Sequence, residues 1–206
     1  MIEANHFWFQ RLFFNAYIPF ILRRDFKSHN ITGKFEDRGL PLLLIGNHFS
    51  WWDGFFPYAL NRKMFKRRLY LMMLEEQLAS RRFLRRLGAF SINPGSRTAV
   101  DSINYASQIL KDKNNLLIIF PQGNIRSQYD NEIVFQKGWF RILKSTAHPV
   151  HVLFMANLTD YFSNRKPSLY TYIEDYPETV NFVFEELSSG FSSFFKRCID
   201  QQKQLV

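Results

Sequence analysis

Two short runs of apolar residues, each followed by a polar loop, constrain the fold of this chain more than any other feature. Residues 42–45 lead into the loop 47–53, and residues 116–119 lead into the loop 120–127. A short apolar run bounded by turn residues predicts a buried strand. In open α/β sheets, ligand-binding residues collect outside the carboxyl ends of such strands. We therefore predict that both loops lie at one edge of a sheet.

The rest of the chain alternates between strand-like and helix-like patterns. Further strands are predicted at 31–39, 69–73, 89–92, 150–155 and 169–173, and helices at 50–60, 75–87, 97–110, 139–147 and 184–198. This alternation predicts an α/β sandwich, with a central, largely parallel or mixed sheet flanked by helices. Because no repeat or long linker is present, we predict a single domain over residues 1–206. Its parts are an amino-terminal helical segment at 1–30, a core at 40–175 and a carboxyl-terminal helix at 178–206.

The amino-terminal segment is unusually aromatic. Residues 7–18 hold Phe, Trp and Tyr at high density, and Pro19 interrupts the run. The segment is too short and too interrupted for a membrane-spanning helix, which needs about 20 apolar residues, and it lacks the pattern of a secretory signal. We predict a helix that lies in a membrane interface. The alternative is an ordinary core helix.

Charge and aromatic content point to an anionic surface as a partner. The chain has 27 Lys and Arg against 18 Asp and Glu, a net charge of +9, and 17% aromatic residues. Aromatic side chains with basic ones favour an anionic membrane surface. Because no nucleic-acid module is recognisable, we expect no nucleic-acid partner. The single cysteine, Cys198, excludes an internal disulfide and fits a reducing compartment.

Basic residues gather in two neighbouring groups. They are Arg62, Lys63, Lys66, Arg67 and Arg68, followed by Arg81, Arg82, Arg85 and Arg86. The second group repeats at a spacing of four, which predicts one cationic face on a helix over 75–87. That face can contact anionic lipid or an acidic carrier protein. The alternative is a solvated helix face, which is the usual role of such a run.

The first loop offers a base and a carboxylate. His48 is suited to proton transfer near neutral pH, and Asp53 can orient its ring if His48 lies on the loop and Asp53 in the first helical turn. The alternative is structural. Ser50 and Asp53 also fit a capping box, in which Asp53 serves only the helix end.

The second loop offers an anion-binding pattern. Gly123 lets backbone N–H groups approach an anion, and Arg126 can hold phosphate oxygens in a bidentate fork. The alternative is a plain strand-to-turn connection in which Pro121 and Gly123 form the turn. A nucleotide P-loop is excluded because its glycine and lysine pattern is missing.

Taken together and in this order, the loops resemble the glycerophospholipid acyltransferase superfamily, which includes the lysophosphatidic acid acyltransferases. His48 to Asp53 resembles the His-x-x-x-x-Asp motif, and residues 120–127 resemble the Phe-Pro-Glu-Gly-Thr-Arg-Ser block. Residues 135–138 resemble Phe-Lys-x-Gly, residues 149–152 resemble an apolar strand with a proline, and residues 88–92 resemble the second block, whose arginine appears only later, at Arg97. The chain departs from the family at Gln122 and Asn124, and Ile125 is inserted before Arg126.

The resemblance implies a single acyltransferase-like domain that needs no cofactor and no metal. The acyl donor would be acyl-CoA or acyl carrier protein, and the acceptor a hydroxyl of a lysophospholipid or another lipid. His48 would be the general base and Asp53 its orienting group, with backbone N–H groups near Gly123 at the oxyanion. The remaining substrate-binding residues would be Phe120, Pro121, Gln122, Gly123, Asn124, Arg126 and Lys137.

The location implied is peripheral or monotopic, at the cytoplasmic face of a membrane. Two other functions stay open for a chain of this kind. One is a thioesterase, in which water replaces the acceptor hydroxyl. The other is a lipid-binding homologue whose catalysis is altered by Gln122 and Asn124.

Overall fold

A seven-stranded sheet forms the centre of the protein, whose computed structural model describes residues 1–130 and 132–205. The strands are β1 (His29–Thr32), β2 (Leu42–Gly46), β3 (Arg68–Leu74), β4 (Ala89–Ile92), β5 (Asn115–Ile119), β6 (His151–Asp160) and β7 (Ser168–Asp175). Their order across the sheet is β1-β7-β6-β2-β5-β3-β4, and only the β6–β7 pair is antiparallel. The predicted α/β class with a mostly parallel sheet is confirmed.

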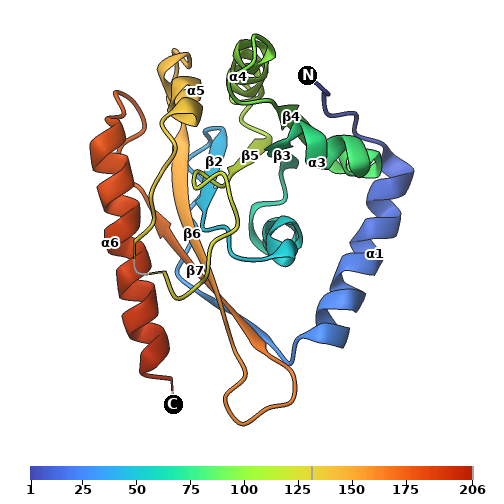
Figure 1. Ribbon diagram of the computed structural model, residues 1–206, viewed down its shortest axis with the longest axis vertical. Coiled ribbons are helices and arrows are strands. Elements are labelled where there is room, and N and C mark those ends of the chain that lie inside the picture. The colour runs from blue at the N-terminus through green and yellow to red at the C-terminus, as the bar shows by residue number, and fades with distance from the viewer. Residues whose placement is uncertain (131, 206) are drawn as a thin grey trace.

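Helices cover both faces of this sheet (Figure 1). The α-helices are α1 (Trp8–Asp25), α2 (Phe55–Leu60), α3 (Glu75–Ser80), α4 (Thr98–Ile109), α5 (Arg141–Lys144) and α6 (Phe184–Lys203). Short tighter or wider turns are η1 (Trp51–Gly54), η2 (Asn61–Phe65), η3 (Arg82–Leu87) and η4 (Gly138–Phe140). In Figure 1, α6 lies on one side of the sheet and α1 on the other.

The alternation of side chains along the strands explains the three layers. In β2, Leu43 and Ile45 join the hydrophobic cluster beneath α4, α5 and α6, whereas Leu42 and Leu44 join the cluster beneath α1 and α2. Successive side chains of a strand point to opposite faces, so a strand that is covered on both faces must be apolar throughout. This is why residues 42–45, all of them fully buried, formed the clearest strand pattern in the sequence.

The amino-terminal helix α1 continues through Pro19, and the expectation that the proline interrupts it is wrong. Proline has no N–H, so the Asn15 carbonyl one turn earlier loses its partner within the helix. The guanidinium of Arg62 donates to this carbonyl, and the Tyr58 hydroxyl donates to the Asn15 side chain at 2.9 Å. Side chains from the neighbouring α2–η2 segment thus satisfy the group that the proline leaves free.

The basic segment 75–87 is not one helix, contrary to expectation. Arg81 has φ −129° and ψ 49°, which ends α3, and the chain continues as the 3₁₀ turn η3. A 3₁₀-helix has three residues per turn, so residues four apart, such as Arg82 and Arg86, no longer share a face. The predicted single cationic face is therefore wrong.

Other boundaries shift without changing the layers. The strand predicted at 31–39 is β1 at His29–Thr32, and the helix predicted at 139–147 is shortened to η4 and α5. The helix predicted at 50–60 begins with the 3₁₀ turn η1 before α2. Within residues 1–130 and 132–205, no helix is long and apolar enough to cross a membrane.

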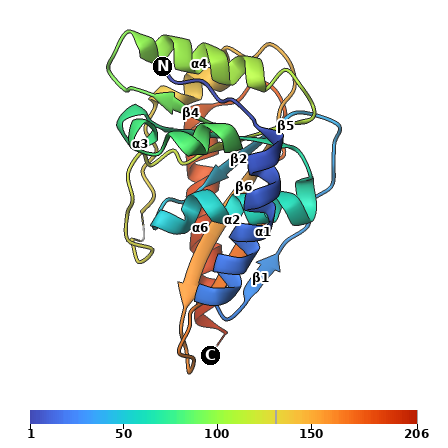
Figure 2. The same ribbon diagram turned by 90° about the vertical axis from the view of Figure 1, so that its right-hand side faces the viewer.

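Gly88 shows why the turn between η3 and β4 needs glycine. Its φ is +108°, and a Cβ atom there would lie 1.9 Å from the Leu69 carbonyl oxygen. Only glycine combines this backbone conformation with so close an approach. The turn carries the chain directly into β4, an edge strand of the sheet (Figure 2).

Candidate active site

The loop after β2 is held in place by a buried pair of asparagines. The Asn47 side chain donates to the Asn157 carbonyl at 2.9 Å and accepts from the Asn157 N–H at 2.8 Å. Both residues are buried, and Asn157 belongs to β6, the neighbour of β2. The two bonds fix the residue that directly precedes His48 to the central sheet. No pattern in the sequence indicates this role for Asn47.

His48 and Asp53 lie in direct contact. The Nδ1 atom of His48 is 2.6 Å from the Oδ2 atom of Asp53, and the Asp53 side chain is fully buried. An ionised carboxylate can only accept hydrogen bonds, so the contact requires a proton on Nδ1. In the neutral ring, Nε2 is then an acceptor. A histidine held in this way is oriented for proton transfer at Nε2. The geometry is the one that the sequence predicted for this pair.

Asp53 also forms the capping box that was the structural alternative. Its Oδ2 atom accepts from the backbone N–H groups of Phe49 at 2.6 Å and Ser50 at 2.9 Å, and its Oδ1 atom accepts from the Ser50 hydroxyl at 3.0 Å. The Ser50 hydroxyl in turn accepts from the N–H of Trp52 at 3.1 Å. Asp53 therefore serves the helix end and His48 at once, and the two interpretations are not exclusive.

The second loop, residues 120–127, holds the backbone of His48 through two hydrogen bonds. The Gln122 side-chain oxygen accepts from the His48 N–H at 2.6 Å, and the Arg126 N–H donates to the His48 carbonyl at 2.9 Å. The Phe120 ring stacks on the imidazole with a centroid distance of 4.9 Å. Gln122 is 7% exposed, so its contact with His48 is shielded from water. The sequence assigned Gln122 to the substrate, but in the structure its amide oxygen positions His48.

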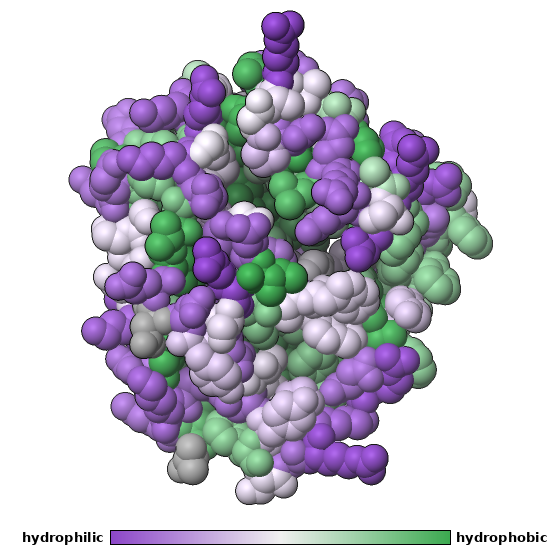
Figure 3. All heavy atoms as spheres, viewed as in Figure 1, coloured by the Kyte–Doolittle hydropathy of each residue, from purple (hydrophilic) through white to green (hydrophobic). Residues whose placement is uncertain are grey.

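The two loops line a large cavity. Its volume is about 1030 Å³, and His48, Phe120, Pro121, Gln122, Gly123 and Asn124 are among the residues that line it. One part of the lining is apolar and comes from α1, α2, β3 and η3, with Ile18, Phe55, Tyr58, Leu71, Phe83 and Leu84. Another part is more polar and comes from the segments 94–104 and 136–145 around α4 and α5. Figure 3 shows a hollow with apolar residues in it on this face.

Neither of the two predicted substrate-binding cations lines this cavity. Arg126 is exposed and contributes its backbone, not its side chain, to the site. Lys137 is 80% exposed, lies 3.7 Å from the carboxylate of Glu185 and stacks over the ring of Phe184, both on α6. The Gly123 N–H donates to the Phe120 carbonyl within the turn at 3.1 Å. It is therefore not free for an oxyanion.

Metal ligands are not gathered anywhere in the described part of the chain. Within residues 1–130 and 132–205, no group of three or more His, Cys, Asp and Glu side chains could hold a metal ion. Cys198 is buried on α6, and burial raises the pKa of its thiol to about 12. It lies outside the cavity lining, so its chemistry is separate from that of His48.

The mostly parallel sheet thus brings the His48–Asp53 pair and the glycine-containing loop to one cavity. Residues 6–156 match the sequence model of the family described as Acyltransferase, and this stretch includes both loops. The chain belongs to this family.

Individual relatives agree with this assignment. The chain is 29% identical over 110 residues to a 1-acyl-sn-glycerol-3-phosphate acyltransferase of Streptococcus pneumoniae (strain ATCC BAA-255 / R6), a match that covers 51% of this chain and 38% of that protein. The match thus spans well under two thirds of the relative. The crystal structure of the 1-acyl-sn-glycerophosphate (LPA) acyltransferase PlsC from Thermotoga maritima superimposes with a TM-score of 0.60 at 18% identity, covering 87% of this chain and 73% of that one. This likeness shows a shared fold.

Proposed function

We propose that the protein transfers a fatty acyl group from an acyl thioester to a hydroxyl of a lysophospholipid or another lipid acceptor at a membrane surface. The observation that carries the proposal is the 2.6 Å contact between His48 and Asp53 at a cavity large and apolar enough for an acyl chain. Membership of the Acyltransferase family supports the same reaction class. The donor is proposed to be acyl-CoA or acyl carrier protein.

The reaction follows from the orientation of the imidazole. His48 Nε2 takes the proton of the acceptor hydroxyl while that oxygen attacks the thioester carbonyl. Asp53, buried and bonded to Nδ1, stabilises the imidazolium that forms. When the tetrahedral intermediate collapses, the C–S bond breaks and the departing thiolate takes the proton back from Nε2. The products are an ester and a free thiol, and the enzyme is regenerated without a covalent intermediate.

The apolar part of the lining is suited to the acyl chain. It is formed by side chains from α1, α2, β3 and η3, and Ile18 of α1 is almost fully buried there. Burial of each methylene from water contributes about 0.8 kcal/mol. A chain of a dozen carbons therefore gains enough binding free energy in such a cavity to fix the thioester carbonyl beside His48.

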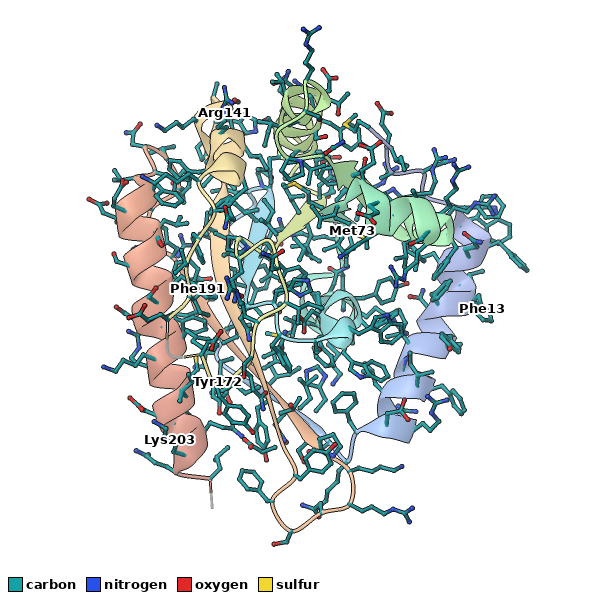
Figure 4. All side chains as sticks on the ribbon, viewed as in Figure 1. Phe13, Met73, Arg141, Tyr172, Phe191 and Lys203 are labelled. Atoms are coloured by element: carbon teal, nitrogen blue, oxygen red, sulfur yellow. The ribbon has the colours of Figure 1, made fainter. Side chains whose placement is uncertain are left out.

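The outer face of α1 supports action at a membrane. Phe14, Ile18, Ile21 and Leu22 are buried against the protein, whereas Trp8, Phe9, Leu12, Phe13, Tyr17 and Phe20 are exposed. At about 100° per residue, these two sets fall on opposite sides of the helix. A helix that is apolar on its outer face, with Arg23 and Arg24 at its end, suits insertion among lipid headgroups. Figure 4 shows Phe13 on the side of α1 that faces away from the sheet.

The test is an acyl-transfer assay on vesicles that contain lysophosphatidic acid and labelled acyl thioester. The wild-type protein should form labelled diacyl lipid, and the His48→Ala variant should form at least about a thousandfold less. Free fatty acid released at the same rate with and without the acceptor would contradict transfer and would indicate a thioesterase. Equal amounts of lipid product from both proteins would show that the reaction does not need His48.

A further inference from the structure

The hairpin of β6 and β7 ends in a tip, residues 161–167, that projects from the molecule beside the end of α1 (Figures 1 and 2). The first two residues of the tip are aromatic and exposed, Tyr161 at 58% and Phe162 at 43%. A single exposed apolar side chain is ordinary, but adjacent aromatic ones at a projecting tip indicate a contact surface.

The backbone of Phe162 is strained. Its φ of +43° lies in the left-handed region, which bulky side chains rarely adopt and which Gly or Asn adopts readily. The turn is closed by the Asn164 N–H, which donates to the Tyr161 carbonyl at 2.8 Å. Strained positions of this kind cluster at functional sites. A turn that only joins two strands is better built with Gly or Asn at position 162, so phenylalanine there indicates a use for the ring itself.

The charge of the tip is positive. Arg165 and Lys166 are exposed, and residues 161–167 contain no Asp or Glu. Asp160, directly before the tip, accepts from the Gln202 side chain on α6 at 2.6 Å, so its carboxylate is engaged elsewhere. Exposed aromatic rings next to cations match the headgroup region of an anionic bilayer, where the rings insert and the cations meet phosphates.

Hydrogen bonds fasten the tip to the end of α1. Lys27, two residues after α1, donates from its backbone N–H to the Pro167 carbonyl at 2.8 Å. The ammonium of the same residue donates to the Asn164 side chain at 2.5 Å. β1, which follows directly, pairs in parallel with β7. The tip therefore keeps a fixed position relative to the exposed aromatic face of α1.

The base of the hairpin is also bound to the loop beside His48. The Gln128 side chain accepts from the Thr159 N–H at 3.1 Å and donates to the Thr159 carbonyl at 3.0 Å. Residues 120–125, directly before in the chain, line the cavity. The hairpin is thus connected both to α1 and to the segment that positions the imidazole.

We propose that the hairpin tip is a second membrane contact, which inserts Tyr161 and Phe162 among the headgroups of an anionic bilayer while Arg165 and Lys166 bind lipid phosphates. This proposal rests on the membrane-surface part of the proposed function, in which α1 is the first contact. A molecule held by one helix can roll about the axis of that helix. Two separate contacts prevent this motion and keep the cavity in one orientation relative to the lipid.

The first experiment places a fluorescent label on the tip of the full chain. Ser163→Cys provides an exposed thiol, whereas the native Cys198 is buried and reacts little. The label is nitrobenzoxadiazole, and the vesicles are phosphatidylcholine with or without an equal part of phosphatidylglycerol. On the anionic vesicles the label should become brighter, and a nitroxide attached to lipid should quench it. The matched control is Ser193→Cys, exposed on α6 across the sheet from α1, where the label should stay in water (Figure 1).

The second experiment measures vesicle binding by co-sedimentation. Phe162→Asn removes the ring and suits the left-handed backbone, so it should fold normally and bind both kinds of vesicle about tenfold more weakly. Lys166→Gln should weaken binding about fivefold on anionic vesicles only. The controls are Val183→Ser, 42% exposed beside α6, and Lys196→Gln, exposed on α6. Each control should change binding less than twofold.

Several results would overturn the proposal. They are a Ser163 label that stays in water while the protein is bound, a Phe162→Asn or Lys166→Gln variant that binds anionic vesicles like the wild type, and equal losses in the α6 controls. A dimer that forms without vesicles and is lost in Phe162→Asn would assign the tip to a second copy of the chain. The proposed function fails separately: a tip that inserts, in a protein that forms no labelled diacyl lipid, removes acyl transfer and leaves the membrane contact.

Discussion

Replacing Asp53 with asparagine isolates the electrostatic part of the His48–Asp53 contact. Asparagine keeps the shape, and its carbonyl oxygen can still accept from the N–H groups of Phe49 and Ser50 at the helix start. The same oxygen position also faces His48 Nδ1, so the ring keeps an acceptor but loses the negative charge that stabilises the imidazolium. If the amide instead turns its NH₂ group toward Nδ1, the ring must adopt the other tautomer and present N–H to the substrate. The catalytic effect should therefore exceed the effect on folding.

The expected magnitude follows from the bonds involved. A hydrogen bond to a charged group contributes about 1.5–3 kcal/mol, which at 1.36 kcal/mol per factor of ten is about ten- to a hundredfold in rate. A wrong tautomer raises the loss to about 10⁴-fold in related triads. We expect kcat of Asp53→Asn to fall by about 10² to 10⁴ in the acyl-transfer assay. KM should change little, because Asp53 is fully buried.

Ser50→Ala is the matched control. It removes the Ser50 hydroxyl bonds to Trp52 and to Asp53 Oδ1 but leaves the 2.6 Å contact with His48 in place. It should lower the free energy of unfolding by about 1 kcal/mol, as loss of a helix cap does, and change kcat less than tenfold. The reasoning is refuted if Asp53→Asn keeps more than a third of wild-type kcat, or if Ser50→Ala lowers kcat as much.

Three further predictions concern stability and are measured by urea unfolding. Asn47→Ala leaves the buried N–H and carbonyl of Asn157 in β6 without their side-chain partners and should lower the free energy of unfolding by about 2–4 kcal/mol. An unchanged free energy of unfolding would contradict this role of Asn47. Burial lowers the pKa of His29 to about 4 from 6.5, so the unfolded chain binds a proton first as the pH falls. Stability should decrease from pH 7.5 to pH 5 by about 2 kcal/mol through this group, and His29→Gln should flatten the change. Gly88→Ala should unfold the protein or cost several kcal/mol, whereas Gly39→Ala, with no atom within 4 Å of its Cβ, should cost only about 1–2 kcal/mol for its φ of +67°.

The sheet was predictable because its central strands are apolar on both faces. Residues 42–45 and 116–119 are buried at every position, and a continuous apolar run that ends in turn residues has few other interpretations. The capping pattern of Ser50 and Asp53 was visible for a different reason, because it depends only on residues close in sequence. His48 came within reach of Asp53 because both lie in that local turn.

The remaining features depend on contacts between distant segments. The helix across Pro19 requires Arg62 to supply the missing donor, and no pattern near residue 19 indicates this. Lys137 is near the second loop in sequence, yet its side chain turns to Glu185 on α6. Periodicity placed Arg82 on a helix, but the backbone at Arg81 breaks it. The contacts of Arg62 and Lys137 join segments far apart in the sequence, so no local pattern could indicate them.

The position of α1 has a consequence for how a long substrate enters. Ile18 on its inner side contributes to the cavity, while Phe13 and Phe20 on its outer side meet whatever surrounds the molecule. At this place α1 alone separates the cavity from the surroundings of the protein. If the protein acts at a membrane surface, as proposed, a small outward tilt of α1 would let a hydrocarbon tail move from the bilayer to His48 without passing through water. A covalent cross-link between α1 and position 58 should then slow turnover of substrates with long acyl chains far more than turnover of short, water-soluble ones.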